Sequence, residues 1–172
     1  MLLRQLLECT PETVQGLVLA ADERYWEGYE LLLAGRSFAS IYLWGYVAEM
    51  LLKSAALRFD GAQPSELVGP RLGPAKTFGK QHFPLVPCES YHSLRFRANH
   101  LTANRSRASC TFTATFLTEF NRKVQRMYDT WLVSMRYHPA SWSGYSSSIQ
   151  PAALDLLEDV EWLRKNHSFL WS

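Results

Sequence analysis

The sequence lacks the residue patterns of the common metal sites and phosphate-cleaving enzymes. Its three cysteines lie far apart, and no two of its five histidines are three or four residues apart. Zinc ligands usually come in pairs at such spacings. A glycine-rich phosphate loop that follows a strand and a Gly-x-Ser-x-Gly turn are missing as well. We therefore expect reduced thiols, no bound metal and no cofactor.

Long apolar runs that could cross a membrane are also missing. The longest strongly apolar run without a charge, 37–48, is too short to span a bilayer. A longer uncharged run, 137–154, is rich in serine and contains two prolines, which is typical of a loop. Near the amino terminus, Arg4 and Glu8 interrupt the apolar block that a signal peptide needs. We therefore expect a cytoplasmic protein with no membrane partner.

What the sequence does contain is typical of a helical globular domain. The chain of 172 residues is 47% hydrophobic and 20% charged, and it carries six Trp, eight Tyr and nine Phe. Apolar residues recur every three or four positions, and no segment shows the alternation of a half-buried strand. The pattern predicts long helices over 11–34, 37–59, 113–135 and 151–166, with a shorter helix near 89–103. We predict a single all-α domain, an up-and-down bundle of four main helices.

Local residues indicate where the first elements begin and end. Thr10 and Pro11 are an N-cap and a first helical residue, and Gly35 follows the first helix. The second helix, 37–59, is apolar on nearly every side, so we predict that it is the buried central element. Residues 61–88 contain four glycines and five prolines in 28 positions, which predicts a long irregular insertion after the second helix.

Charge is unevenly distributed along the chain. Residues 1–60 hold five basic and eight acidic residues, whereas 71–107 hold seven basic residues against Glu89 alone. A cationic segment of this kind favours a phosphate-bearing partner. It is also compatible with a solvated loop, or with docking on the acidic first helix of a second subunit.

Two segments share the order and spacing of one known family of helical domains. Residues 20–57 include LLLAGRSFASIYLWGYVAEMLLKSAAL, a helix hairpin with a buried internal Glu and a later Leu-Lys pair. Residues 134–165, SMRYHPASWSGYSSSIQPAALDLLEDVEWLRK, contain an Arg-Tyr-His-Pro stretch, a loop and a last amphipathic helix. YHSL at 91–94 is similar to a short His-containing segment between the two. In this order the segments resemble the HEPN domain family.

The resemblance implies a HEPN-like scaffold. Members of the family include metal-independent ribonucleases, non-catalytic partners of minimal nucleotidyltransferases, toxin–antitoxin proteins and domains that bind nucleotides or RNA. Ribonuclease members carry an Arg followed a few residues later by a His. Here Arg136 and His138 are separated by one residue, and only Arg95 and His100 have the family's spacing. Many members form homodimers, which the abundance of aromatic residues also favours.

Glu49 is the clearest polar exception on the second helix. A carboxylate among apolar neighbours needs a partner or must be protonated. Lys53, one turn further on, and Arg136, far along the chain, are the candidates. Glu49 and Lys53 are therefore interpreted as structural polar residues, with a nucleotide pocket as the alternative for Glu49.

Two groups of residues are candidates for binding or chemistry. In the first, Arg136 could clamp a phosphate, Tyr137 could stack on a base and His138 could move a proton. The helix dipole alone also favours a cation there. In the second, Arg97 and His100 share one face of a helix, about 60° apart, while Arg95 is about 140° from His100.

We predict a non-catalytic HEPN-like module that forms a homodimer. It would bind a nucleotide, RNA or a nucleotidyltransferase-type or toxin–antitoxin partner. The residues expected to bind the nucleotide or RNA are Arg95, Arg97, Arg136, Tyr137 and His138. One alternative is a metal-independent ribonuclease, for which His100 and His138 are the candidate catalytic residues. The other is a purely structural interaction domain.

Overall fold

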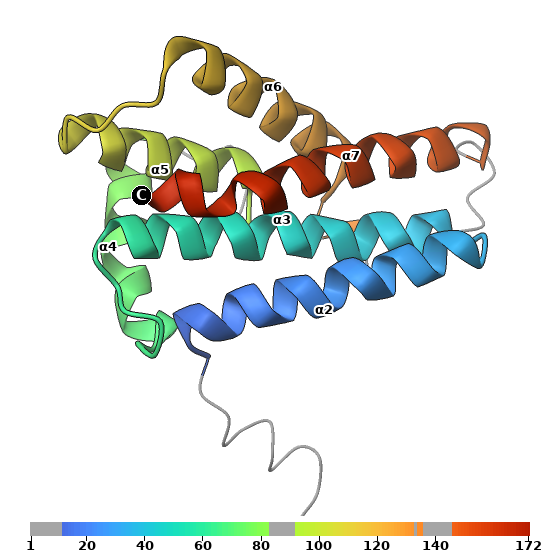
Figure 1. The fold of residues 1–172 in the computed structure, drawn as a ribbon, viewed down its shortest axis with the longest axis horizontal. Helices are drawn as coiled ribbons and strands as arrows, with labels where there is room; N and C mark the ends of the chain where they lie inside the picture. Colours follow the sequence, from blue (N-terminus) through green and yellow to red (C-terminus); the bar gives the residue numbers. More distant parts are fainter. Residues whose placement is uncertain (1–11, 83–91, 133, 136–145) are drawn as a thin grey trace, which may run out of the picture.

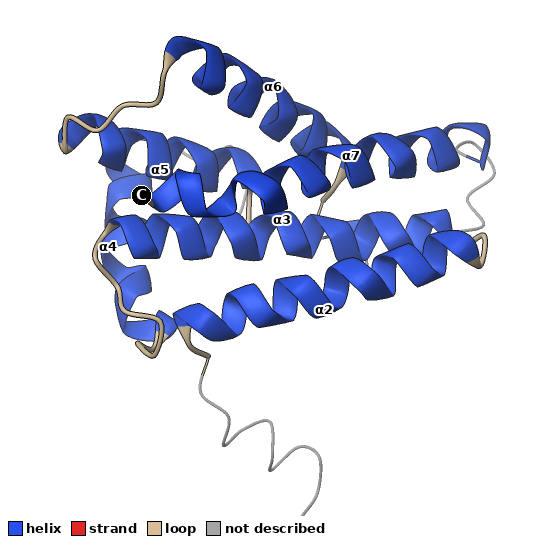
Figure 2. Cartoon of the chain, viewed as in Figure 1, coloured by secondary structure: helices blue, strands red, loops and turns tan. Residues whose placement is uncertain are grey.

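The computed structural model describes residues 12–82, 92–132, 134–135 and 146–172. In these residues it contains six α-helices and no strand (Figures 1 and 2). The helices are α2 (Val14–Leu33), α3 (Ser37–Phe59), α4 (Val68–His82), α5 (Leu94–Arg107), α6 (Ala114–Thr130) and α7 (Ser146–Trp171). They pack against one another, so the prediction of an all-α protein is confirmed.

α3 is the central helix. More than half of its 23 residues are buried, and it packs most closely against α2 and α7 and also contacts α5. The prediction of a buried helix over 37–59 is confirmed. Figure 1 shows that α3, α5 and α7 run in one direction and α2 and α6 in the opposite one. α4 crosses one end of this arrangement.

α2 and α3 form a tightly packed hairpin. The Thr13 hydroxyl accepts a hydrogen bond from the backbone N–H of Gly16 at 2.9 Å and caps the start of α2. The turn between the helices places Gly35 at a φ of 73°, a conformation that favours glycine. Within the hairpin, the Trp44 indole N–H donates to the Tyr25 carbonyl at 3.0 Å. The two helices are therefore joined by a buried hydrogen bond as well as by apolar packing.

The segment 61–88 was predicted to be irregular, and this is wrong for its middle part. Residues 68–82 form α4 despite their glycines and prolines. Pro70 lies in the first turn of the helix, where a backbone N–H would have no helical acceptor. Val68 and Ala75 of α4 are buried, so packing against the rest of the protein compensates for the poor helix propensity.

Other predicted boundaries also differ from the structure. The N-cap of α2 is Thr13 and its first residue is Val14, not Thr10 and Pro11, which lie outside the described residues, and α7 runs to Trp171 rather than 166. α5 extends to Arg107, α7 begins at Ser146 rather than at Pro151, and α6 ends at Thr130 rather than near 135. α6 ends early because Trp131 adopts an extended backbone and its indole N–H donates to the Tyr42 carbonyl on α3 at 3.2 Å. A tertiary contact of this kind leaves no local pattern in the sequence.

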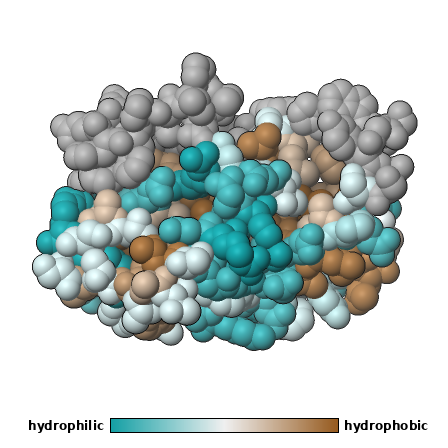
Figure 3. All heavy atoms as spheres, turned by 90° about the horizontal axis from the view of Figure 1, so that it is seen from above, coloured by the Kyte–Doolittle hydropathy of each residue, from teal (hydrophilic) through white to brown (hydrophobic). Residues whose placement is uncertain are grey.

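Charged residues connect α6 and α7. The ammonium of Lys123 lies 2.9 Å from Asp159, and the guanidinium of Arg126 lies 2.6 Å from the same carboxylate. Lys123 and Asp159 are both buried. Figure 3, which views the molecule from the side of α6, shows hydrophilic residues across the middle of this face.

Among the described residues, no helix has the length and apolar character needed to cross a membrane.

Candidate functional site

Polar side chains line one face of α5 and meet polar side chains of α3. On α5, Arg97, His100, Asn104 and Arg107 follow at intervals of three and four residues, so they share a face. On α3, Glu49 and Asp60 are three turns apart, which also places them on one face. We call these six residues the α3–α5 seam. All of them except Asp60 and Arg107 are buried.

Glu49 and Arg97 lie at one end of the seam. Glu49 is buried and accepts a hydrogen bond from Nδ1 of His92, an exposed side chain, at 2.8 Å. Arg97 is only 6% exposed, and its Nε has no hydrogen-bond partner. Burial lowers the pKa of Arg97, and the negative charges of Glu49 and Glu12 partly offset this effect. A buried guanidinium is thus present without an ion pair to any residue that the structure describes.

His100 lies in the middle of the seam and is 4% exposed. Its ring stacks on that of Phe96 with a centroid separation of 6.1 Å, and the Asn104 amide lies 3.4 Å from its Nε2. Burial lowers the pKa of His100 to about 4, and the nearby charges of Arg97 and Arg107 act in the same direction. The imidazole is therefore neutral near pH 7.

Asp60, Asn104 and Arg107 form the other end of the seam. The side-chain NH2 of Asn104 donates to Asp60 at 2.6 Å, and the Arg107 guanidinium donates to the side-chain oxygen of Asn104. Partial desolvation by its neighbours raises the pKa of Asp60, although the charge of Arg107, the hydrogen bond from Asn104 and the charge of Arg71 oppose it. An open hollow at this end is lined by these three residues together with Phe59, Gly61 and Ala108.

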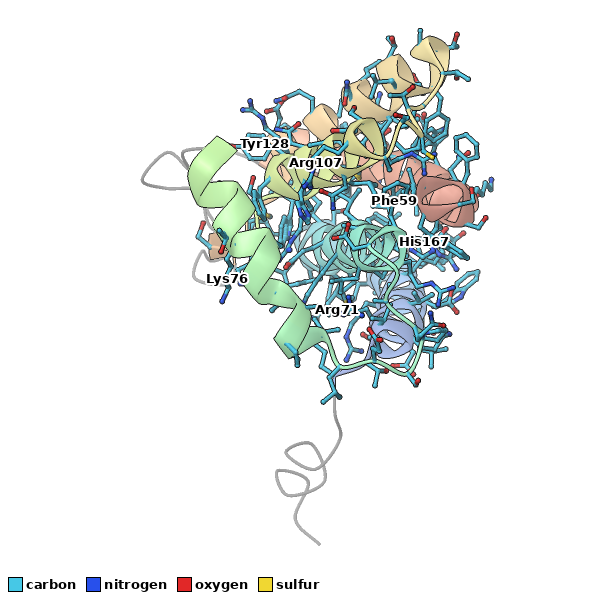
Figure 4. All side chains as sticks on the ribbon, turned by 90° about the vertical axis from the view of Figure 1, so that its left-hand side faces the viewer. Phe59, Arg71, Lys76, Arg107, Tyr128 and His167 are labelled. Atoms are coloured by element: carbon cyan, nitrogen blue, oxygen red, sulfur yellow. The ribbon has the colours of Figure 1, made fainter. Side chains whose placement is uncertain are left out.

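Figure 4 looks onto this end of the molecule, where α4 crosses in front of the other helices. Arg71 and Arg107 lie on the side of α4 that faces α3, and Lys76 lies on the opposite side. Arg71 is bonded to Glu66 at 2.9 Å through its Nε. The labelled cations of the segment 71–107 therefore lie on two different sides of α4.

The structure places the residues predicted from the sequence in different surroundings. Arg97 and His100 share a face of α5, as expected from their spacing, and this face is buried. Arg95 is exposed and lies over the Tyr128 ring at 5.2 Å. Arg95 and His100, which have the family's spacing, therefore do not face a common space. Lys53 is bonded to Glu12 at 2.8 Å, while the bonded partner of Glu49 is His92. Arg136, Tyr137 and His138 lie outside the described residues.

Sequence reasoning missed His92, Asn104, Asp60 and Arg107. The spacing of Arg97, His100, Asn104 and Arg107 was visible in the sequence, but the predicted helix ended near 103 and left the last two outside it. His92 could not be assigned to Glu49 because the two are 43 residues apart. Such a pairing becomes visible only when α3 and α5 are packed together.

Comparison of the chain with protein-family models, with curated proteins and with solved structures gave no match. In the part of the chain that the structure describes, no group of three or more His, Cys, Asp or Glu side chains is arranged to hold a metal ion. The chemistry of the seam side chains is what indicates a ligand.

Proposed function

We propose that the chain is a non-catalytic HEPN-like module that binds a nucleotide or RNA through a phosphate group at the α3–α5 seam. The observation that carries this proposal is Arg97, a guanidinium that is 6% exposed and has no hydrogen bond at Nε. Leaving a buried N–H donor such as this Nε without an acceptor is costly. A bound anion would supply the acceptor.

A phosphate fits the seam better than a larger anion does. The small exposed fraction of Arg97 admits only a compact group, while phosphate oxygens match the planar fork of a guanidinium. Arg107 is exposed on the same face of α5, where it can contact a further phosphate of a ligand that remains at the surface.

The state of His100 supports a binding role over cleavage. A ribonuclease needs a histidine that can take up or release a proton near neutral pH and that reaches the substrate. His100 is 4% exposed, and burial lowers its pKa to about 4. It is therefore better suited to shaping the seam than to general acid–base catalysis.

The up-and-down topology of the four long helices and the HEPN-like character of the fold belong to the same proposal. The alternating directions of α2, α3, α6 and α7 support it. The homodimer and the nucleotidyltransferase-type or toxin–antitoxin partner remain predictions. They depend on surfaces other than the seam.

Titration with ATP and with a single-stranded RNA oligonucleotide at low salt tests the proposal. We expect one of them to bind, and the affinity to fall as salt rises. Arg97→Met should lower the affinity by about tenfold or more, because the variant keeps the length of the side chain but loses its donors. The absence of binding by both probes, or an unchanged affinity for Arg97→Met, contradicts the proposal.

Arg105→Met is the matched control. Arg105 is a second buried arginine of α5 whose Nε also lacks a partner, but its Nη1 donates to the carbonyls of Leu170 and Ser172 at 3.0 and 2.9 Å. The folded variant should keep the affinity of the wild type. In a parallel incubation without metal, the RNA should stay intact. Cleavage that His100→Gln abolishes would support the ribonuclease alternative.

A further inference from the structure

The outer face of α2 carries an apolar stripe that none of the other described helices covers. Leu19, Trp26 and Leu33 are 58%, 54% and 73% exposed, and Tyr29 beside them is 37% exposed. Residues seven apart on a helix drift by only about 20°, so Leu19, Trp26 and Leu33 lie in one line. The line is about 21 Å long. We call these four residues the α2 stripe. An exposed apolar surface of this length is typical of an interaction site.

A groove between α2 and α7 opens beside the stripe. Val18, Leu51 and His167 line this groove, and Leu19 belongs to both the groove and the stripe. The charged residues at its rim are already paired, Arg164 with Asp22 and Lys165 with Glu161. Arg164 also stacks over the Tyr25 ring at 3.8 Å. The groove can therefore take an apolar side chain without leaving a rim charge unpaired.

Acidic residues border the stripe on the side away from the groove. Glu23 and Glu30 are exposed and seven residues apart, about 10 Å along the helix. Neither makes an ion pair with any residue in the described ranges, whereas Glu27 is paired with Arg24. Two unpaired carboxylates along an apolar line favour a partner that carries cations at the same spacing.

These features argue against an antiparallel two-fold contact between the stripes of two copies of the chain. In an antiparallel two-fold contact, the border that carries Glu23 and Glu30 would meet the same border of the other copy. Like charges placed opposite each other destabilise such a contact. A homodimer, as predicted from the sequence, would then use another face.

We propose that the α2 stripe and the α2–α7 groove dock an amphipathic helical segment of a partner protein. The segment lays its apolar face on Leu19, Trp26 and Leu33 and inserts one large apolar side chain into the groove. Lysine or arginine residues at its border pair with Glu23 and Glu30. This contact uses α2 and α7 and is independent of phosphate binding at the α3–α5 seam.

Two synthetic peptides of about 15 residues, the length that covers the stripe, test this proposal. Both carry the same leucine face, and they differ only in a border of lysines or of glutamates. We expect the lysine peptide to bind wild-type protein about tenfold or more tightly than the glutamate peptide does, as measured by the anisotropy of a label on the peptide. In the double variant Glu23→Lys, Glu30→Lys the preference should reverse.

Trp26→Ser tests the apolar part of the contact, and Leu132→Ser is its control. Leu132 is 55% exposed but lies at the end of α6, away from the stripe. Trp26→Ser should abolish binding of the lysine peptide and Leu132→Ser should leave it unchanged, with both variants folded by circular dichroism. Equal binding of both peptides, or binding of neither, overturns the proposal. The proposal is also overturned if the wild-type protein sediments as a dimer and Trp26→Ser sediments as a monomer. In that case a second copy of the chain occupies the α2 stripe.

Discussion

Gly45 of α3 lies directly against the indole ring of Trp131. A Cβ placed on Gly45 would lie 2.0 Å from ring carbons of Trp131, so no side chain fits there. The indole occupies this place because α6 ends at Thr130 and the chain then extends along α3. The lack of a side chain at Gly45 of α3 therefore allows Trp131 to pack there, at the point where α6 ends.

Gly45→Ala should destabilise the protein by about 2–4 kcal/mol, since the indole must leave its position and lose its hydrogen bond to Tyr42. Urea unfolding followed by circular dichroism measures the change. The control is Gly73→Ala on α4, where a Cβ meets nothing within 4 Å. This variant should be neutral or stabilised by about 0.5–1 kcal/mol, because alanine favours the helix. Equal effects of the two substitutions would contradict the packing around Trp131.

Arg97→Met and Arg105→Met should change the stability in opposite ways. Arg97 has no bonded acceptor, so its replacement by an apolar side chain should leave the stability unchanged or raise it by up to about 2 kcal/mol. Arg105 binds two carbonyls at the end of α7 and lies over Phe112 at 4.2 Å, so its loss should cost about 2–4 kcal/mol. Chemical denaturation without ligand measures both. A large loss of stability in Arg97→Met would mean that this guanidinium is a structural cation.

The stability should decrease as the pH falls from about 6.5 towards 4. The pKa of His100 is about 4 in the folded protein and near 6.5 when unfolded, so the unfolded state binds more protons in this range. The loss from His100 alone is on the order of 2–3 kcal/mol. Burial also lowers the pKa of His167, which acts in the same direction. Asp60, whose pKa burial raises, acts in the opposite direction.

Comparison with His100→Gln isolates this contribution. Urea midpoints at several pH values should give a shallower decrease for His100→Gln than for the wild type. Identical slopes would show that His100 is not kept neutral by burial.

Asp159→Asn should cost about 3–5 kcal/mol, because it leaves Lys123 buried with a weakened counter-charge. The loss should change little with salt, since both groups are buried. The control Glu27→Gln removes a carboxylate that is paired with Arg24 at the surface and should cost less than about 1 kcal/mol. Thermal unfolding at low and high salt measures both variants, and a strong salt dependence for Asp159→Asn would contradict the buried arrangement.

The sequence pattern alone was sufficient to predict a helix when the residues next to its two ends determine where it begins and stops. The predicted bounds of 37–59 agree with α3, since Gly35 precedes it and Asp60 and Gly61 end it. α4 was missed because its prolines and glycines describe a weak helix, whereas its stability comes from the burial of Val68 and Ala75.

The candidate site was predictable only where it depends on one helix. That Arg97 and His100 share a face follows from their spacing. That the face is buried, that Glu49 bonds His92 and that Asp60 bonds Asn104 all depend on the packing of α3 against α5. The sequence predicted a binding role for Arg97 but not its burial, which the structure shows.

The pairing of α3 with α7 affects the order in which the chain can fold during synthesis. Ser54 and Arg58 near the end of α3 contact His167 and Trp171 near the end of α7, more than 100 residues later. While the ribosome is still making that interval, the apolar side of α3 that α7 will cover stays in water. The hairpin of α2 and α3 therefore leaves the ribosome long before it can be buried, and a chaperone that shields it then would protect the nascent chain from aggregation.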